Sequence, residues 1–389
     1  MSILEQLVSE LCPEGVPFVP LSHFLDYEQP GKYLVASKDY DDKHLTPVLT
    51  AGKTFLLGHT AEKDGIYGAS RARPVIIFDD FTTAFKWVDF PFKAKSSAMK
   101  LLTPKRGTGT LLRYAFYVMQ TIRYAPEDHA RQWIGTYSNI RVPVPPLEVQ
   151  REIVRILDQF TELEAELEAE LEARRRQYHF YRDALILTAS TPYIPLAQLG
   201  TFIRGRRFTK SDVVDSGIPS MHYGEIYTHY GVSAKRAAQE VRADLAPQLR
   251  FARPNDVIFA GVGETVEEVG KAVAWLGESP IAIHDDAFAF TSDLDPTYVS
   301  FAVQTADFHS QKSNFVARGK VKRLSAASTA RIEIPVPSKS EQERIVGMLN
   351  HFEALVKDAN AGLPAGIEAR RKQYEYYRDR LLTFEEATA

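Results

Sequence analysis

The sequence is poor in cysteine, with Cys12 as the one cysteine among 389 residues. No disulfide can therefore form within the chain, and this composition fits a protein kept in a reducing cytoplasm. Apolar runs of 18 residues or more are also missing, so we expect no membrane-spanning helix. The first residues, MSILEQLVSELCPEGV, are acidic and contain Pro13 and Gly15, unlike a cleaved leader. We expect a soluble, unprocessed, cytoplasmic protein.

Motifs for nucleotide and zinc chemistry are absent as well. The sequence has no Gly-x4-Gly-Lys-Ser/Thr phosphate loop and no paired Cys/His spacing, so we expect neither an ATP site nor a zinc site. Two acidic groups could hold a catalytic metal, namely Asp79–Asp80 and His284–Asp286. Each follows a short apolar run, VIIF or IAI, so we interpret both as one duplicated structural turn. We predict no metal site.

A glycine-rich segment, DVIFAGVGE, places Gly261 and Gly263 after an apolar run, as cofactor loops do. A lone Gly-x-Gly is a weak signal, and we interpret this one as a β-turn. The proline pair Pro145–Pro146 lacks the Asn or Asp before it and the aromatic residue after it that a catalytic loop of adenine methyltransferases needs. The sequence favours a non-catalytic protein, with a stand-alone adenine methyltransferase or nuclease as the alternative.

Charge is spread unevenly along the chain. The net charge is −3, whereas residues 16–147 carry a net charge of +5 and residues 191–337 a net charge of 0. The acidic excess therefore lies outside these two segments. A basic first segment could meet phosphate groups, although a solvated surface produces a mild excess of this size equally well.

The most informative feature that is present is an internal repeat. The segment ARRRQYHFYRDAL (residues 173–185) is repeated as ARRKQYEYYRDRL (residues 369–381). Likewise, PVPPLEVQREIVRILDQF (143–160) is repeated as PVPSKSEQERIVGMLNHF (335–352). Fainter correspondences, VPFVPL near residue 16 and TPYIPL near residue 191, open the segments before each copy. Both of those segments are rich in short β-type runs. The chain therefore reads domain, helix, domain, helix.

The first copy predicts one long helix. No Gly or Pro interrupts Leu147–Thr188, and apolar residues recur three, four or seven positions apart. Its middle, ELEAELEAELEA, is typical of a coiled coil, and the helix would be roughly 60 Å long. The second copy begins with Ser340 and Glu343, a possible capping box. Gly362, Pro364 and Gly366 then predict a break between two helices.

These patterns resemble the specificity (S) subunits of type I restriction–modification systems over the whole chain. That family alternates two variable domains with two helical regions, each running from P-[LV]-P-x4-Q to R-[RK]-Q-Y-x-[FY]-Y-R. The resemblance implies an α+β fold with two β-rich target-recognition domains. Two long antiparallel helical (coiled-coil) regions would separate them, with the halves related by an approximate two-fold axis. The expected boundaries are 1–147 for the first domain with a short N-terminal helix, 148–190 for the central helix, 191–337 for the second domain and 338–389 for the C-terminal helical region.

The resemblance also implies a DNA-recognition subunit that reads a bipartite target in double-stranded DNA, one domain for each half-site. It implies two methyltransferase subunits as partners and, through them, restriction subunits. S-adenosylmethionine, ATP and Mg²⁺ would then belong to the partners, with no cofactor in this chain.

Candidate DNA-binding residues lie in basic or hydrogen-bonding clusters, because Lys and Arg neutralise phosphate and Arg can bridge guanine. In the first domain they are Thr50, Lys53, Thr54, His59, Ser70, Arg71, Arg73, Thr82, Thr83, Lys86, Lys95 and Ser96. In the second domain they are Arg204, Arg206, Arg207, Lys210, Ser220, His222, Tyr223, Tyr227, His229, Tyr230, Lys312, Arg318, Lys320, Lys322 and Arg323. Candidate partner-binding residues, taken from the helical signature, are Gln150, Arg175, Arg176, Gln177, Arg182, Gln342, Arg371, Lys372, Gln373 and Arg378. Tyr178 and Tyr181 are expected to pack the two helices together.

Overall fold

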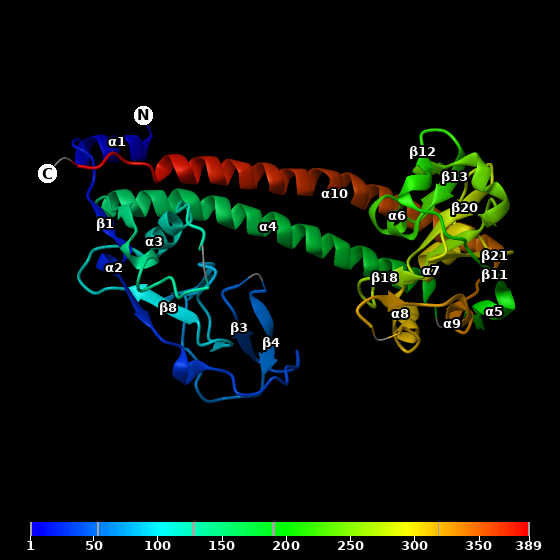
Figure 1. Cartoon of the computed structure of the whole chain (residues 1–389), viewed down its shortest axis with the longest axis horizontal. Helices are drawn as coiled ribbons and strands as arrows, with labels where there is room; N and C mark the ends of the chain where they lie inside the picture. Colours follow the sequence, from blue (N-terminus) through cyan, green and yellow to red (C-terminus); the bar gives the residue numbers. More distant parts are fainter. Residues whose placement is uncertain (1, 53, 127–128, 189–190, 318, 388–389) are drawn as a thin grey trace. The chain divides into compact units, whose positions relative to one another are not determined.

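The computed structural model describes residues 2–52, 54–126, 129–188, 191–317 and 319–387, and the side chains of 355–363 lie outside this description. The chain divides into two compact units. Unit 1 comprises Met1–Glu168 and Ala365–Ala389, and unit 2 comprises Ala169–Pro364. Each unit therefore holds one β-rich domain together with half of each long helix (Figure 1).

Unit 1 contains two main sheets and a two-stranded sheet, β1-β9. The larger has the strand order β2-β8-β5-β6 and the smaller has the order β4-β3-β7. The strands are β1 (Phe18–Pro20), β2 (Leu25–Glu28), β3 (Thr46–Leu49), β4 (Leu56–Thr60), β5 (Val75–Asp79), β6 (Phe85–Val88), β7 (Lys93–Ala94), β8 (Met99–Pro104) and β9 (Arg141–Pro143). The short helices are α1 (Ile3–Leu11), α2 (Leu21–Phe24) and α3 (Leu112–Met119), with 3-10 turns η1 (Gly31–Tyr33) and η2 (Tyr137–Asn139).

Unit 2 repeats this plan with additional strands. Its main sheets have the orders β11-β21-β17-β19-β14 and β12-β15-β13-β20-β16, and two-stranded sheets pair β10 with β23 and β18 with β22. The strands are β10 (Tyr193–Pro195), β11 (Gly200–Arg204), β12 (Val213–Val214), β13 (Ile218–Met221), β14 (Ser233–Ala234), β15 (Gln239–Val241), β16 (Phe251–Ala252), β17 (Val257–Ala260), β18 (Val262–Gly263), β19 (Ala272–Trp275), β20 (Ile281–Ile283), β21 (Ala287–Ser292), β22 (Lys322–Arg323) and β23 (Glu333–Pro335). The shorter helices are α5 (Leu196–Leu199), α6 (Tyr223–Thr228), α7 (Pro296–Ala302), α8 (Ala306–Ser313) and α9 (Ala326–Thr329), with 3-10 turns η3 (Lys210–Asp212) and η4 (Ala243–Gln248).

The strand orders give the correspondence between the two domains. β2, β8, β5 and β6 match β11, β21, β17 and β19, and the parallel pair β3–β7 matches the parallel pair β13–β20. Asp79 ends β5, whereas His284 follows β20, so the two acidic groups occupy different places in the fold. The interpretation of both as one duplicated turn is therefore wrong. The two segments have similar sequences after an apolar run, but strand equivalence depends on pairing with segments distant in sequence.

The long helices are α4 (Leu147–Ile186) and α10 (Lys339–Leu381). The predicted break at Gly362–Gly366 is wrong, since α10 stays helical through Pro364. A proline removes one backbone hydrogen bond and costs about 3 kcal/mol. One such loss does not end a helix whose two halves are both held by packing, as the buried Leu349 and Ile367 indicate. The predicted cap is also displaced, because the Ser338 hydroxyl, rather than Ser340, accepts the Glu341 amide.

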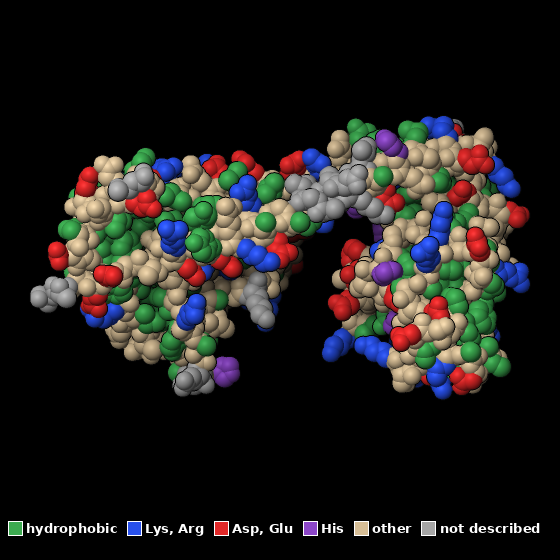
Figure 2. All heavy atoms as spheres, turned by 90° about the horizontal axis from the view of Figure 1, so that it is seen from above, with side chains coloured by type: hydrophobic (Ala, Val, Ile, Leu, Met, Phe, Trp, Pro, Cys, Tyr) green, Lys and Arg blue, Asp and Glu red, His purple; other side chains and the backbone are tan. Residues whose placement is uncertain are grey.

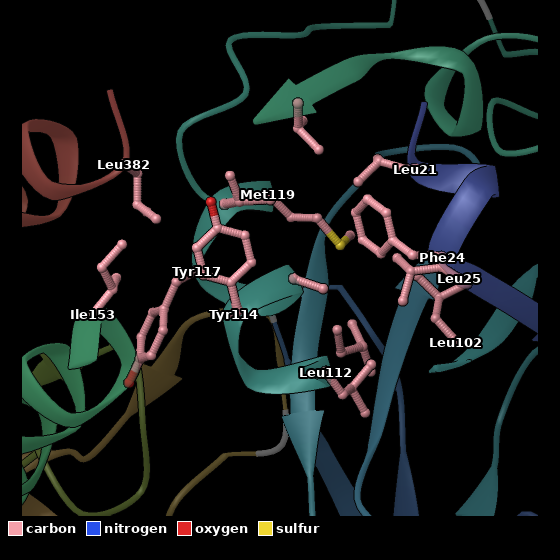
Figure 3. Close-up of a cluster of buried hydrophobic side chains, with 14 of the residues drawn as sticks. Leu21, Phe24, Leu25, Leu102, Leu112, Tyr114, Tyr117, Met119, Ile153 and Leu382 are labelled. Carbon is pink, nitrogen blue, oxygen red and sulfur yellow. The ribbon is translucent and has the colours of Figure 1, made fainter. Parts of the chain in front are cut away.

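The first long helix shares a core with the first domain. Val149, Ile153 and Leu157 of α4 are buried in the same cluster as Tyr114 and Tyr117 of α3. Figure 3 shows Ile153 and Leu382 beside these α3 side chains. In unit 2, Ile345 and Leu349 of α10 join the core that contains Tyr298 and Phe301 of α7. No helix in the described part of the chain is long and apolar enough to cross a membrane.

Candidate nucleic-acid interface and helical signature

The basic loop after β11, residues 204–210, is anchored at several points. The backbone amide of Gly205 donates to Ala287 O and that of Arg206 donates to Ile283 O. A Cβ atom at Gly205 would lie 2.1 Å from His284 O, so only glycine allows the loop to approach β20 this closely. Phe208 is buried, and it fixes the far end of the loop. The loop is therefore held in place while Arg206 and Arg207 are exposed.

The His284–Asp286 segment supports this loop. The Asp286 amide donates to His284 Nδ1 at 3.2 Å, and the Arg204 Nε donates to the Asp285 carbonyl at 2.8 Å. The Asp286 carboxylate pairs with Arg323 at 3.1 Å. Burial lowers the pKa of His284, which favours the neutral imidazole. These three residues lie close enough to share a cation, but His284 Nδ1 accepts the Asp286 amide and the Asp286 carboxylate pairs with Arg323. We assign them no metal.

The basic segment around β22 lies next to the 204–210 loop, with residues 284–286 in contact with both. β22 pairs with β18, which places Arg323 opposite Val262. Arg204 and Arg323, 119 residues apart in the sequence, line one recess of about 190 Å³ together with Asp285 and Asp286. Of the glycines in DVIFAGVGE, Gly261 lies between β17 and β18 and Gly263 ends β18, which pairs with β22. The fold brings together two clusters that the sequence separates.

Several predicted DNA-binding residues of unit 2 are occupied inside the domain. Lys312 is fully buried, its ammonium donates to the carbonyls of Glu267 and Val269 at 2.8 Å, and burial lowers its pKa to about 8. The Tyr227 hydroxyl donates to Val262 O, the Tyr230 hydroxyl accepts the Ala238 amide, and Ser220 is buried. We therefore remove these four side chains from the DNA-binding set.

Other candidates of unit 2 remain at the surface. His222 is half-buried, caps α6 by accepting the Gly224 amide, and has its pKa lowered by burial and by His284. Arg318 lies outside the described residues. The candidates that are exposed or half-buried are Arg204, Arg206, Arg207, Lys210, His222, Tyr223, His229, Lys320, Lys322 and Arg323.

The first-domain candidates lie in three turns and on nearby strands. Thr50 orders the β3–β4 turn, since its hydroxyl donates to Thr54 O. Ser70 and Arg73 close a tight turn through paired backbone hydrogen bonds. Lys53 lies outside the described residues, and Thr83 is removed because it is buried at a positive φ of 57°. The candidates that are exposed or half-buried are Thr50, Thr54, His59, Ser70, Arg71, Arg73, Thr82, Lys86, Lys95 and Ser96.

The acidic pair Asp79–Asp80 is structural. The Asp79 carboxylate accepts the amides of Phe81 and Thr82, which shapes the turn after β5. Asp80 is fully buried, lies 3.1 Å from the equally buried Lys100 ammonium, and accepts the Trp133 amide at 2.8 Å. A buried carboxylate with these partners links two segments of the domain. On the face shown in Figure 2, basic and acidic side chains are interspersed.

Two glutamines of the helical signature form hydrogen bonds that join helix to domain. Gln150 is buried, accepts the Leu111 amide at 3.0 Å and donates to Pro145 O at 2.8 Å. Gln342 repeats this with the Asp295 amide at 3.0 Å and Pro337 O at 2.9 Å. Each glutamine thus ties the first turn of a long helix to the start of a domain helix. We remove both from the partner-binding set.

Arg182 also acts within its own unit. It is buried against Asp183, whose carboxylate accepts the Ala306 amide at the start of α8. Arg378 pairs with Asp379 and lies partly over the Tyr374 ring. The signature residues that stay exposed or half-buried without a role in the domains are Arg175, Arg176, Gln177, Arg371, Lys372 and Gln373.

The expected helix packing by Tyr181 is confirmed, and that by Tyr178 stays a prediction. Tyr181 stacks on Phe352 within unit 2, with ring centroids 5.6 Å apart. Tyr178 lines a pocket with His309 of α8, and burial raises its pKa to about 12. Its repeat equivalent Tyr374 donates a hydrogen bond to Gln120 in the first domain. This position therefore joins helix to domain.

A further connection between helix and domain in unit 1 was not predicted from the sequence. Arg113 of α3 donates to the Asp158 carboxylate of α4 at 2.7 Å, and its guanidinium lies 4.7 Å from the Trp87 ring centroid. The Tyr117 hydroxyl donates to the same carboxylate. No signal in the sequence pairs residues 45 positions apart, so only the fold identifies this contact.

The comparisons with known proteins agree with this architecture. A family model described as the type I restriction modification DNA specificity domain matches residues 81–173. The chain is 38% identical to the EcoR124I/EcoR124II type I restriction enzyme specificity subunit of Escherichia coli, over 99% of this chain and 97% of that protein. It is 28% identical to a putative type I restriction enzyme specificity subunit of Haemophilus influenzae, over 70% and 72%.

A solved structure also shares the fold. It comes from work on complex assembly and conformational transition of the type I R–M system, with a TM-score of 0.51, 14% identity, and coverage of 92% of this chain and 97% of that one. Two β-rich domains alternating with two long signature helices define the class as DNA-recognition subunits. The chain belongs to the family of type I restriction–modification specificity subunits.

Proposed function

We propose that the chain reads a bipartite double-stranded DNA target, with the domain of unit 1 on one half-site and that of unit 2 on the other. The observation that carries this proposal is that the two domains are attached to the long helices in the same way but expose different residues. Both domains attach to their long helices through the same contacts, since Tyr114 and Tyr298 each donate to the carbonyl of a signature proline at 2.9 and 2.8 Å. The exposed candidate residues differ between the domains, as two different half-sites require.

In unit 2 the proposed DNA-binding surface consists of the loop carrying Arg206 and Arg207 and the neighbouring Arg204 and Arg323. An anchored loop loses little backbone entropy on binding, which favours both phosphate contacts and bidentate guanine contacts by its arginines. In unit 1 the proposed surface is formed by the turns at Thr50–Thr54, Ser70–Arg73 and Asp79–Thr82.

As a specificity subunit the chain has a DNA-recognition role rather than a catalytic one, and it assembles with other subunits. The finer assignment is that two methyltransferase subunits bind the long helices and that restriction subunits join through them. S-adenosylmethionine, ATP and Mg²⁺ are then held by those partners. A cytoplasmic location follows from a chromosomal DNA target. A stand-alone methyltransferase or nuclease is not favoured.

Exchange of one domain tests the proposal. Residues 16–142 are replaced by the first domain of another family member, and methylated adenines are mapped in cells that also express the cognate methyltransferase subunit. We expect one half-site to change and the other to persist. Simultaneous change of both half-sites would contradict independent reading. Methyl transfer to DNA by the purified chain alone would contradict the non-catalytic role.

A further inference from the structure

The recess lined by Arg204 and Arg323 contains charges of both signs. Two guanidinium groups and the carboxylates of Asp285 and Asp286 border a volume of about 190 Å³. The recess begins directly after β17, the strand that corresponds to β5 of unit 1. It therefore lies at the sheet edge that corresponds, in unit 1, to the edge carrying the Asp79–Thr82 turn of the proposed DNA-binding surface.

The backbone of Arg323 is fixed on both sides. The Ala317 amide donates to the Arg323 carbonyl at 3.1 Å, and the Leu324 amide donates to Gly261 O at 2.9 Å. Arg323 also lies opposite Val262 in the β18–β22 ladder. These contacts set the point from which the Arg323 side chain extends into the recess.

Asp286 orients the Arg323 guanidinium from a position that is itself fixed. Its backbone amide donates to His284 Nδ1 at 3.2 Å, and its carbonyl accepts the Gly261 amide at 2.8 Å. Its carboxylate accepts an N–H of Arg323 at 3.1 Å. The Asp286 side chain is 23% exposed, whereas that of Arg323 is 60% exposed. The carboxylate is therefore mostly enclosed, while most of the guanidinium faces the solvent.

The other charged groups of the recess also combine a fixed position with free hydrogen-bonding capacity. The Arg204 Nε donates to the Asp285 carbonyl at 2.8 Å, which leaves the remaining N–H groups of this guanidinium free. The Asp285 carboxylate lies 3.2 Å from His284 Nδ1 and pairs with no Lys or Arg in the described part of the chain. The recess thus offers N–H donors and a carboxylate acceptor side by side.

The two carboxylates favour a base edge over a phosphate as the group bound in the recess. A phosphate would meet the negative charges of Asp285 and Asp286 as well as the arginines, which weakens its attraction. A base edge carries no net charge. In the major groove a C·G pair presents the O6 and N7 acceptors of guanine and the N4 amino donor of cytosine. Arginine is the usual partner of the guanine atoms, and a carboxylate accepts from the cytosine amino group.

The arginines of the neighbouring loop have different surroundings. Arg206 and Arg207 are exposed and have no ion pair in the described part of the chain. Cations of this kind attract phosphate whatever the base sequence. The proposed surface of unit 2 therefore divides into a loop suited to the DNA backbone and a recess suited to a base pair.

We propose that the recess reads one C·G base pair in the half-site of unit 2. Arg323 donates to guanine O6 and N7, and the Asp285 carboxylate accepts from the cytosine amino group. Asp286 is a positioning residue that holds the Arg323 guanidinium in the reading orientation. This inference rests on the proposed function and names the residues that specify one base pair of its target.

The test uses the complex of the full chain with its cognate methyltransferase subunit. Domain exchange with methylome mapping identifies the half-site of unit 2. Duplexes in which each base pair of that half-site is replaced in turn are then compared by fluorescence anisotropy. With the unaltered chain, replacement of one C·G pair should weaken binding roughly tenfold or more.

Variants of Arg323 separate base reading from phosphate binding. Arg323→Ala should remove most of the discrimination at that C·G pair and leave the other positions unchanged. Arg323→Lys keeps the positive charge but loses the bidentate geometry, so it should lose the same discrimination. A phosphate contact would instead survive in the lysine variant. Because lysine also keeps a long side chain on β22, this variant serves if the alanine variant folds poorly.

Asp286→Asn tests the positioning role without changing the size of the side chain. It should relax preference at the same C·G pair while binding to non-specific DNA stays equal or becomes tighter, because a negative charge is removed. A carboxylate needed for folding alone would lower the melting temperature without altering preference at one base pair. Arg242→Ala is the matched control, since it breaks another Asp–Arg pair of unit 2, Asp212–Arg242 at 3.1 Å, outside the recess. It should leave the discrimination at the C·G pair unchanged.

Three results would overturn the proposal while leaving the recognition role intact. They are a half-site of unit 2 without a C·G pair, undiminished discrimination in the folded Arg323 variants, and uniform weakening by Arg323→Ala with a shallower dependence on salt. Failure of the unaltered complex to prefer any bipartite sequence would overturn the proposed function itself.

Discussion

Phe160 of α4 stacks on Tyr377 of α10, with ring centroids 5.4 Å apart and an interplanar angle of 22°. Phe352 and Tyr181, the same two repeat positions, stack in unit 2 at 5.6 Å and 2°. Each pair takes its phenylalanine from one copy of the signature and its tyrosine from the other. The repeated segments therefore form the same Phe–Tyr contact once in each unit. Each unit is completed by residues from both halves of the sequence.

The anchored basic loop gives the first prediction. Arg206→Ala with Arg207→Ala should weaken DNA binding by the assembled complex, because two preorganised cations are lost. If both contact phosphate, the slope of log K against log salt becomes shallower by roughly 2. If either reads a base, one half-site is relaxed at a cost of about 1–3 kcal/mol. A fluorescence-anisotropy titration at several salt concentrations measures both effects.

A second exposed basic pair in the same unit serves as the control. Lys235→Ala with Arg236→Ala removes the same charge beside a different recess, which also contains Glu240 and Glu278. We expect this variant to bind DNA nearly as the unaltered chain does. Unchanged affinity and specificity of the Arg206/Arg207 variant would exclude the loop as a DNA contact.

The repeated ELEA unit gives the second prediction. Deletion of Glu166–Ala169 shortens α4 by roughly 6 Å and turns it by about 40°. The next ELEA unit then replaces the deleted one, so Glu172 takes the place of Glu168 beside Arg371. At roughly 3.4 Å per base pair, the two half-sites should be recognised at a spacing shorter by one or two base pairs. Methylome mapping measures this spacing, and an unchanged spacing with retained activity would make the helix a simple tether.

The buried pair Asp80–Lys100 gives the third prediction. Lys100→Met leaves a buried carboxylate without its counter-charge and should cost about 3–5 kcal/mol of unfolding free energy. Asp80→Asn added to Lys100→Met removes that charge while keeping an oxygen for the Trp133 amide, so most of the loss should be recovered. Urea denaturation measures both variants. A mild effect of Lys100→Met, with no recovery in the double variant, would contradict a buried ion pair.

Lys312 gives the fourth prediction, a dependence of stability on pH. Burial lowers the pKa of Lys312 to about 8 in the folded chain, against an ordinary value of about 10.4 for lysine. Between these values the unfolded chain binds more protons, so the unfolding free energy rises with pH. The rise amounts to about 1.4 kcal/mol for each unit by which the pKa is lowered.

The variant Lys312→Met lacks this titration. The difference in unfolding free energy between the unaltered chain and the variant should therefore shift in favour of the unaltered chain from pH 8 to about pH 10.4. Parallel urea denaturation of the two proteins across this range isolates the contribution of Lys312 from those of other groups. A difference that does not vary with pH would place the ammonium in a solvated site.

The sequence alone determined the repeat, and with it the alternation of domains and long helices. Helix α4 was predictable to within two residues because a helix is held by local hydrogen bonds and by a local apolar period, both readable from Leu147 to Ile186. The resemblance to type I specificity subunits rested on the same repeated segments. The signature glutamines Gln150 and Gln342 were recognised as important, but their predicted role in partner binding is wrong, because they tie helix to domain.

The tertiary structure decided which side chains face the solvent and which strands are equivalent. Lys312 sits in a basic segment, yet its ammonium binds two carbonyls from a loop more than 40 residues away. Asp80 and His284 follow similar apolar runs, yet the strands that they follow, β5 and β20, belong to sheets that do not correspond in the two domains. Strand pairing and burial depend on segments that are distant in sequence, so local patterns cannot specify them.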